Sequence, residues 1–436
     1  MSKDTKIIHD PLHGSIRIDG IFLDILDRHE FQRMHSVKQL GLSYSVFPGA
    51  NHTRLEHSLG VYHLAGKMAE TIEMDDEDSQ AVRAAAMLHD ICHPPFSHTM
   101  EEIMEENTGL DHMDLAKRLI FGEIPTHLER DEDLFGGFEP ISEILESDGI
   151  SSEFVCDLIS LPKSRSDNTD LLSFDGKQSF FTSKDYAHQI IHGPVDADQM
   201  DYLVRDAHYT GVAHGSIDLD RLMSQMRIFN STLVLEKGGI AATEGLMVSR
   251  ALMYSSVYYH KTVRIVEMML TKAAEVSGQD MSHLYLMDDA DLTNMLIGAG
   301  GKASEITRSV LRRRLYKKAF ALYTADADED VLYNLTKYSK YDDRKELEYE
   351  IADRAGVSYT DVVADIPSKS ALLSSIKIGK TDVPILHDGK VRSITRFSPL
   401  AKALQSRSIF DWSVMISSPP EHTEAVEKAA KKVLGL

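Results

Sequence analysis

Apolar residues recur along most of this chain at intervals of three and four positions, a spacing typical of amphipathic helices. Before them, residues 6–19 hold two short β-like runs around a Pro/Gly turn, which predicts a hairpin. Residues 163–185 are polar and predict a loop. The helices that the pattern predicts cover residues 21–42, 55–73, 81–88, 97–104, 111–122, 139–161, 196–206, 241–277, 302–325 and 328–336.

The C-terminal part of the chain has a different pattern. Strand-like runs lie at 383–386, 391–394 and 413–416, the pair Asp388-Gly389 predicts a turn between the first two, and residues 421–434 predict a helix. We therefore expect a mainly α fold with a short N-terminal β-hairpin and a small α+β C-terminal region. The expected units are residues 1–275, a helical extension at 276–380, and residues 381–436.

Composition and charge narrow the class of protein. Hydrophobic residues make up 42% and charged residues 26% of the 436 positions, which is typical of an ordinary globular protein. The formal net charge is −21, from 47 basic and 68 acidic side chains. So acidic a surface repels duplex nucleic acid, but a local cationic cluster can still hold a small anionic substrate.

The low number of cysteines and the lack of long apolar stretches indicate the cellular location. Its two cysteines, Cys92 and Cys156, do not indicate a disulfide framework, and a reducing cytoplasm is the simpler location. The first residues lack an apolar signal core, and no stretch approaches 18 uninterrupted apolar residues. We therefore expect a cytoplasmic protein that does not span a membrane.

Three runs carry candidate chemistry: residues 54–60, 89–98 and 196–206. His89 and Asp90 close an apolar helix, where an ion at the end of the helix axis could be reached by both. An isolated His-Asp pair is more often a capping or solvated pair. His57 and Asp198 change that balance, because two imidazoles and two carboxylates suit a divalent ion and leave positions open for water and substrate.

The ordered pattern H…HD…D resembles the HD phosphohydrolase superfamily. Further runs resemble the deoxynucleoside triphosphate triphosphohydrolases within it, strongly over about residues 6–275. These runs are Phe31-Gln32-Arg33, Lys38-Gln39-Leu40-Gly41, Val46-Phe47-Pro48-Gly49-Ala50, Arg54-Leu55-Glu56-His57-Ser58-Leu59-Gly60-Val61 and Pro95-Phe96-Ser97-His98. The resemblance implies an HD-domain helical core over residues 1–275 and one divalent metal per site, which could be Mn, Mg, Fe, Co, Ni or Zn.

The resemblance also implies a role for each matching residue. The implied metal ligands are His57, His89, Asp90 and Asp198. The residues implied to hold a triphosphate are Arg54, His93, His98, Tyr202 and Arg250. His112 matches the acid that protonates the leaving 5′-oxygen, and His93 and Glu101 are counted with it as candidate catalytic residues. Gln39 and Asp206 match groups that bond the 3′-hydroxyl, and Leu40 and Tyr258 match the pair that crowds the 2′-carbon.

The sequence departs from the family pattern beside these residues. Met113 follows His112 where the family has Glu, which implies either a different orientation of His112 or partial substitution by Asp114. Gln199 stands where the family often has Lys, and Glu101 stands where close relatives have Asp. His35 replaces an expected Arg in the region that binds an activating nucleotide, so such activation is not implied.

The leading expectation is hydrolysis of a dNTP to deoxynucleoside and triphosphate by metal-activated water, in a homo-oligomer, either a dimer or a tetramer. One alternative is a phosphohydrolase of other nucleotides, such as NTPs, monophosphates or a signalling nucleotide. Another is a non-catalytic nucleotide sensor. Simpler roles also stay open: His112 could be a surface polar residue, and Arg250, Tyr258, Gln39 and Leu40 could serve packing alone.

Overall fold

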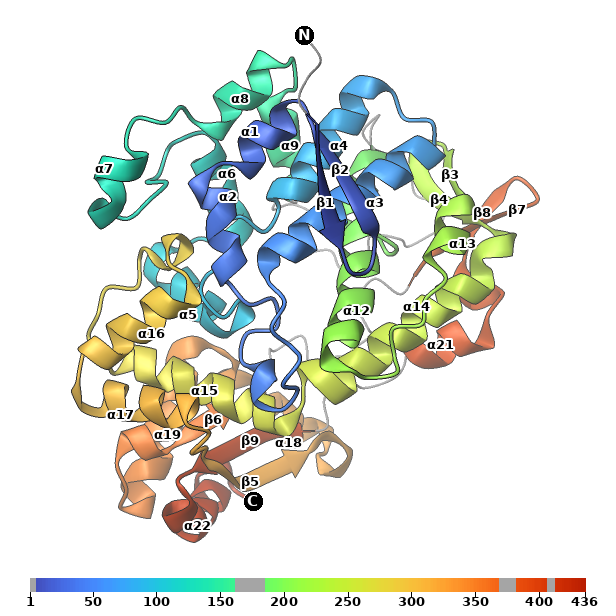
Figure 1. Ribbon diagram of the computed structural model, residues 1–436. Coiled ribbons are helices and arrows are strands. Elements are labelled where there is room, and N and C mark those ends of the chain that lie inside the picture. Colours follow the sequence, from blue (N-terminus) through green and yellow to red (C-terminus); the bar gives the residue numbers. More distant parts are fainter. Residues whose placement is uncertain (1–4, 161–184, 368–381, 406–411) are drawn as a thin grey trace.

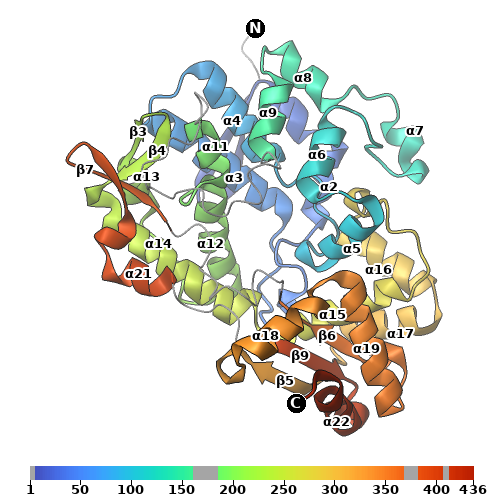
Figure 2. The ribbon, with the colours of Figure 1, turned by 180° about the vertical axis from the view of Figure 1, so that it is seen from behind.

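The computed structural model describes residues 5–160, 185–367, 382–405 and 412–436. In these ranges a helical body carries three small sheets, so the expected mainly α fold is confirmed (Figures 1 and 2). None of the helices described has both the length and the apolar character needed to cross a membrane. The polar loop expected at 163–185 lies almost wholly outside the described residues.

The N-terminal hairpin is confirmed. Strands β1 (Thr5–Asp10) and β2 (Gly14–Asp19) pair antiparallel, and the hairpin packs beside helix α3 (Figure 1). Ile16 and Ile18 of β2 are fully buried, so one face of the hairpin belongs to the main hydrophobic core.

The single helix expected over residues 21–42 is wrong. The structure has three short elements there: α1 (Ile21–Leu26), α2 (His29–Arg33) and a 3-10 turn (Met34–Ser36). Arg28 is extended, with φ −68° and ψ 137°. The side-chain amide of Gln32 donates to the carbonyl oxygen of Leu26 over 2.7 Å. The carbonyl oxygen at the end of α1 is therefore hydrogen-bonded by a side chain. Helical periodicity alone does not indicate that the helix ends there.

Three capped helices form the centre of the fold: α3 (Arg54–Thr71), α4 (Asp76–Leu88) and α12 (Ala197–Thr210). Thr53 and Glu56 make a capping box at the start of α3, while Asp75 and Asp196 cap α4 and α12. Helix α3 packs against both of the others. The helices expected at 55–73, 81–88 and 196–206 are thus confirmed, and α4 ends directly before His89.

Shorter helices surround this centre. They are α5 (His98–Thr108), α6 (His112–Ile120), α7 (Glu132–Phe135), α8 (Ile141–Ser147), α9 (Ser152–Ile159), α11 (Asp185–His192) and α13 (Leu219–Ser224). The helix expected over 139–161 is divided at Gly149, whose φ of +80° is open to glycine at little cost. Cys92 and Cys156 are free and buried, in line with the expected lack of a disulfide.

The helix expected over 241–277 is also divided. It consists of α14 (Ile240–Met253), a π-helical turn (Tyr254–Tyr258) and α15 (Lys261–Glu275). His260 breaks the run, because its backbone is extended and its ring nitrogen Nδ1 accepts the backbone N–H of Thr262.

A four-stranded sheet lies on one side of the helical body (Figure 2). Its order is β3 (Met226–Phe229), β4 (Thr232–Glu236), β7 (Pro384–His387) and β8 (Lys390–Ser393). The strands expected at 383–386 and 391–394 are confirmed in place, and β7 pairs parallel to β4. The β3–β4 hairpin was not expected, although Asn230 and Ser231 both have positive φ, as a tight hairpin turn requires.

The C-terminal body packs helices against a three-stranded sheet, β5 (Lys317–Tyr323), β9 (Trp412–Ser418) and β6 (Val363–Asp365). The helices in this part of the chain are α16 (Asp289–Gly298), α17 (Gly301–Leu311), α18 (Glu329–Leu335), α19 (Tyr341–Ala355), α21 (Pro399–Gln405) and α22 (Thr423–Leu434). The prediction of one helix over residues 302–325 is wrong beyond α17. The residues there form strand β5, which pairs with β9 from the far end of the chain.

The strands of residues 381–436 enter two different sheets. Strands β7 and β8 join β4, whereas β9 lies between β5 and β6. This segment therefore forms no separate sheet in the described residues. The division of the chain at 275 and 380 into units stays a prediction.

Candidate active site

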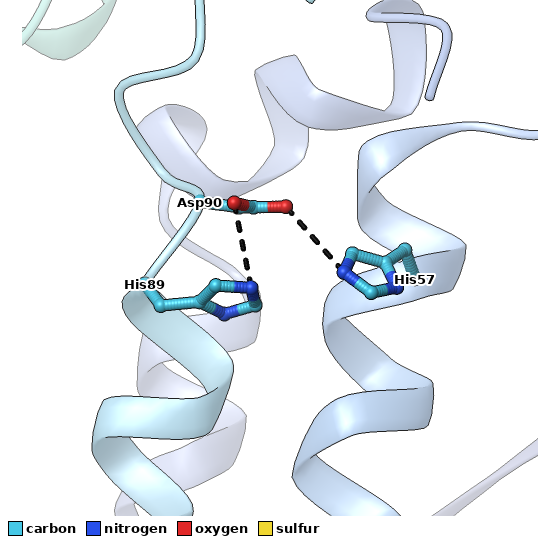
Figure 3. A group of neighbouring side chains, drawn as sticks. All are labelled: His57, His89 and Asp90. Atoms are coloured by element: carbon cyan, nitrogen blue, oxygen red, sulfur yellow. Dashed lines mark ion pairs between the residues drawn. The ribbon is translucent and has the colours of Figure 1, made fainter. Parts of the chain in front are cut away.

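The residues that suit a metal ion meet where α3 and α4 approach each other. His57 lies in the first turns of α3, and His89 and Asp90 follow the last turn of α4 (Figure 3). Asp90 points toward both rings: its Oδ2 lies 3.6 Å from His57 Nε2 and its Oδ1 lies 3.4 Å from His89 Nε2. One ligand atom from each of the three lies within 4.8 Å of the others, and all three residues are buried.

Asp198, in the first turn of α12, completes the set that the sequence predicted. Its Oδ1 lies 3.1 Å from His57 Nε2 and 3.9 Å from His89 Nε2. Its side chain keeps 30% of its exposure, whereas Asp90 keeps 5%. The four residues therefore form a centre that is closed on the Asp90 side and reachable from solvent on the Asp198 side.

The two imidazoles are oriented for metal binding by what their other nitrogens bond. His57 Nδ1 lies 2.7 Å from Asp201 Oδ2, and His89 Nδ1 lies 2.8 Å from the carbonyl oxygen of Ala86. Both Nε2 atoms are buried. His89 Nε2 has no hydrogen-bond partner within the described part of the chain, and His57 Nε2 faces Asp198 Oδ1 at 3.1 Å. An imidazole whose outer N–H is held by a carboxylate or carbonyl is a common metal ligand, so these residues fit a divalent ion.

The charges in the centre favour a cation at the same place. Burial alone would lower the pKa of His57, but hydrogen bonds with Asp198 and Asp201 raise that pKa to about 10. Burial would raise the pKa of Asp90, yet the charge of Arg54 and the hydrogen bond with His93 hold it well below its usual value. A metal and a proton on His57 Nε2 therefore compete for one position.

Asp201 is a site residue that the sequence reasoning did not single out. It lies three positions after Asp198 on α12, so both face α3, and its side chain is fully buried. Arg205 donates to it twice, from Nε to Oδ2 over 2.8 Å and from Nη2 to Oδ1 over 2.9 Å. The i, i+3 spacing of two acids on the helix was the available signal.

The approach of α12 to α3 requires a glycine at position 60. A Cβ there would lie 1.9 Å from Asp201 Oδ1 and 2.5 Å from Arg205 Nη2. Gly60→Ala is therefore expected to lower the free energy of unfolding by about 3 kcal/mol, because a buried ion pair must move. Urea denaturation measures this.

Gly66 of the same helix is the matched control, since a Cβ there would come no closer than 3.4 Å to any of its neighbours. Gly66→Ala should be neutral or stabilise by roughly 0.5–1 kcal/mol. Equal unfolding midpoints for the two variants would contradict the close approach.

Arg54 reaches into the centre from the start of α3. Its Nε donates to Ser97 Oγ over 2.9 Å and its Nη1 donates to Asp90 Oδ2. Its Nη2 is buried without a hydrogen-bond partner in the described residues. A buried guanidinium donor that is not yet used is suited to an oxygen of an anionic substrate.

A second group of side chains lies next to Asp90. His93 belongs to the loop between α4 and α5, and the other members lie on α5 and α6. His93 Nε2 is 3.2 Å from Asp90 Oδ1, and the His93 ring stacks on His112 with a centroid distance of 4.0 Å. Glu101 bonds His112 Nδ1 with one oxygen and, over 2.7 Å, His98 Nδ1 with the other. Glu101, eleven residues upstream, is therefore the hydrogen-bonded carboxylate of His112, a place for which the sequence suggested Asp114.

The same contacts set the charge on each group. Burial would lower the pKa of His112, but the hydrogen bond and charge of Glu101 raise it. Burial and the charge of Arg54 hold the pKa of His93 well below its usual value. The pKa of Glu101, which burial would raise, is held well below its usual value by His98 and His112. These contacts thus favour the protonated form of His112 and the neutral form of His93.

The loop between these two groups is strained and held by a distant acid. Phe96 and Ser97 have φ of 56° and 54°, in the left-handed region that non-glycine residues rarely adopt. Asp289 of α16 accepts the backbone N–H of Phe96 over 2.7 Å and that of Lys38 over 3.2 Å. Sequence gave no indication of this contact, which joins the two loops that carry Gln39 and His93.

The residues expected to contact the sugar form a third group. Asp206 Oδ2 accepts the hydroxyl of Tyr258 over 2.6 Å, and its Oδ1 lies 2.8 Å from His52 Nε2. The backbone N–H of Gln39 donates to the carbonyl of His52 over 3.0 Å. Tyr202, between Asp198 and Asp206 on one face of α12, meets the Tyr258 ring edge-on. Leu40, which follows Gln39, packs against the main core.

Gln199 is directed toward Arg250. Its Oε1 accepts Arg250 Nη1 over 3.1 Å, and its Nε2 donates to Asp196 Oδ2 over 3.0 Å. The residue that departs from the family pattern therefore joins an expected phosphate-binding arginine to the cap of α12.

Comparison with known proteins agrees with this fold and centre. The sequence matches the family "HD domain" over residues 54–204 and the family "HD associated region" over residues 217–436. The chain belongs to the HD-domain phosphohydrolases.

Among its relatives is an uncharacterized protein of Methanocaldococcus jannaschii, 33% identical over 95% of this chain and 80% of that protein. The deoxynucleoside triphosphate triphosphohydrolase SAMHD1 homolog of Dictyostelium discoideum is 27% identical over 72% of this chain, which spans 60% of that relative's length. The crystal structure of a phosphohydrolase from Bacteroides thetaiotaomicron has 25% identity and a TM-score of 0.67, and covers 95% of this chain and 100% of that one.

Proposed function

We propose that this phosphohydrolase cleaves a dNTP to deoxynucleoside and triphosphate. The observation that carries the proposal is the buried centre of His57, His89 and Asp90 beside the unused Nη2 of Arg54 and a His112 that is hydrogen-bonded to Glu101. The dNTP substrate is supported by the similarity to the dNTP triphosphohydrolase relative.

In this proposal His57, His89, Asp90 and Asp198 hold one divalent ion. When bound, the ion supplies Lewis acidity, which activates water and offsets negative charge on the α-phosphate. Asp201 and the carbonyl of Ala86 keep the two imidazoles turned so that Nε2 is available to the ion. The identity of the ion is left to experiment.

In this proposal, side chains of the protein stabilise the negative charge on the triphosphate and supply the proton for the leaving 5′-oxygen. Arg54, His98, Tyr202 and Arg250 would hold the triphosphate, whose negative charge grows as the bond breaks. Water adds its oxygen to the α-phosphorus and releases one proton to the solvent, the bond from that phosphorus to the 5′-oxygen breaks, and His112 gives its proton to the leaving 5′-oxygen. Glu101 keeps that proton on His112, and neutral His93 lies against the ring as a stacking partner.

In this proposal the third group of side chains, around Asp206, selects the sugar. Leu40 and Tyr258 would crowd the 2′-carbon, while Gln39 and Asp206 would bond the 3′-hydroxyl. A site that offers the 2′-hydroxyl of a ribose no hydrogen-bond partner disfavours the ribonucleotide, because that hydroxyl would be buried and unpaired.

One departure from the family pattern favours a second candidate. The neutral Gln199, which bonds Arg250 Nη1, stands where the family often has Lys, so the site offers a triphosphate one cation fewer. The second candidate is hydrolysis of another nucleotide, such as an NTP, a monophosphate or a signalling nucleotide. A homo-oligomer and a cytoplasmic location belong to the leading proposal.

A product assay decides between the candidates. The full chain is incubated with each dNTP and NTP in Mn²⁺, Mg²⁺, Co²⁺ or Fe²⁺, and products are resolved by chromatography. Release of triphosphate from dNTPs but not from NTPs is the expected result. Release of orthophosphate or pyrophosphate would support the second candidate, and nucleotide-induced thermal stabilisation without turnover would indicate a sensor.

A further inference from the structure

The buried carboxylate of Asp201 has a partner on an element distant in sequence, in addition to His57 and Arg205. His13 Nε2 lies 2.6 Å from Asp201 Oδ1, across 188 positions of the chain. The His13 side chain keeps only 6% of its exposure, and Asp201 keeps none. The hairpin turn between β1 and β2 therefore reaches the carboxylate that orients His57.

The turn itself is built to present His13. One oxygen of Asp10, Oδ1, accepts the backbone N–H groups of Leu12 and His13 over 2.9 and 2.8 Å. The other, Oδ2, accepts Arg205 Nη1 over 2.8 Å. Asp10 thus fixes the turn and ties it to the arginine that also bonds Asp201.

We propose that His13 is a positioning residue of the metal centre, which acts through Asp201 on His57. A carboxylate is oriented by the donors on both of its oxygens. His57 and Arg205 Nε bond Oδ2, while His13 and Arg205 Nη2 bond Oδ1. Without His13, Oδ1 keeps one donor, and the carboxylate is less firmly held against His57 Nδ1.

We expect loss of His13 to change the affinity for the metal ion, because the orientation of the His57 ring decides where its Nε2 lone pair points. Loss of an outer partner of a metal-binding histidine weakens metal binding by roughly 10–100-fold. The inference rests on the metal centre of the proposed function but not on which nucleotide is cleaved.

Two variants of similar shape separate donation from packing. His13→Met fills the space with an unbranched side chain that has no N–H, whereas His13→Gln places an amide donor at nearly the same reach. The control is His9→Ala, in the same hairpin, where the ring is exposed and its contact with Ser15 is 3.5 Å long. The hairpin should stay docked in each variant, because Ile16 and Ile18 anchor it in the core.

The experiment titrates chelator-treated full-length protein with Mn²⁺ and, separately, with Zn²⁺, by calorimetry. His13→Met is expected to bind the ion about 10-fold more weakly than wild type, at the low end of the range for losing a direct partner, because Asp201 and Arg205 stay in place. His13→Gln should recover most of this loss, and His9→Ala should bind as wild type does. If His13→Met does not fold, His13→Ala takes its place in the same comparison.

Unchanged affinity in His13→Met, or a loss of equal size in His13→Gln, would overturn the role of His13. Wild-type protein that binds neither ion would overturn the metal centre itself, and with it the proposed function. The two failures are therefore distinguishable without an activity measurement.

Discussion

Asp198→Ala is expected to lose bound metal and to lower turnover by roughly a thousandfold, which corresponds to about 4 kcal/mol of transition-state stabilisation. Asp198 is the proposed ligand on the open side of the centre, and its Oδ1 lies 3.1 Å from His57 Nε2. Because its side chain is 30% exposed, its removal leaves no buried charge unpaired within α12. Stability should therefore change far less than activity.

The measurement combines metal analysis of the purified protein with the product assay. His89→Ala should give the same loss, since its Nε2 is proposed to bind the same ion. Asp157→Ala is the control, because Asp157 is an exposed acid of α9 outside the centre. Full metal content or full activity in either ligand variant would remove that residue from the metal centre.

The second large effect concerns the proton held by His112. Replacement of His112 with Gln is expected to lower kcat by about 10²–10⁴-fold, the usual contribution of a positioned general acid. The loss should be much smaller for bis(p-nitrophenyl) phosphate, whose leaving group needs no proton. Equal losses on the two substrates would indicate that His112 holds phosphate and does not act as an acid.

The pH profile gives an independent measure of the same group. The folded enzyme holds the pKa of His112 above its ordinary value of 6.5, because of Glu101. The protonated form is therefore present at lower pH, and activity should fall as pH rises through that raised pKa. In Glu101→Gln the raising charge is lost while burial remains, so the basic limb of kcat should move to lower pH.

Glu105→Gln, on the exposed side of the same helix α5, is the matched control and should leave the limb in place. A basic limb that does not move in Glu101→Gln would mean that a group other than His112 titrates in the profile.

Much of the centre could be predicted from the sequence because its parts are local. An apolar helix that ends at His89-Asp90 is visible in periodicity, and the caps at Thr53 and Asp196 mark where α3 and α12 begin. The ordered set of two histidines and two aspartates then indicated the family. The helix and cap signals depend on residues within one or two helical turns of one another, whereas the ordered set indicates the family through its order along the chain.

The parts that could not be predicted depend on contacts between distant segments. Strand β5 forms where helical spacing was present, because β9 supplies hydrogen bonds from about a hundred positions away. Glu101 became the partner of His112 only when α5 and α6 packed together.

The sequence by itself thus determined the mainly helical class and the residue types of the metal centre. Only the tertiary structure decided which carboxylate orients His57, and that the N-terminal hairpin bonds the same carboxylate through His13. The physical reason is that a hydrogen bond requires two groups within about 3 Å. Local pattern fixes such distances inside a helix, while packing of the whole chain fixes them between elements.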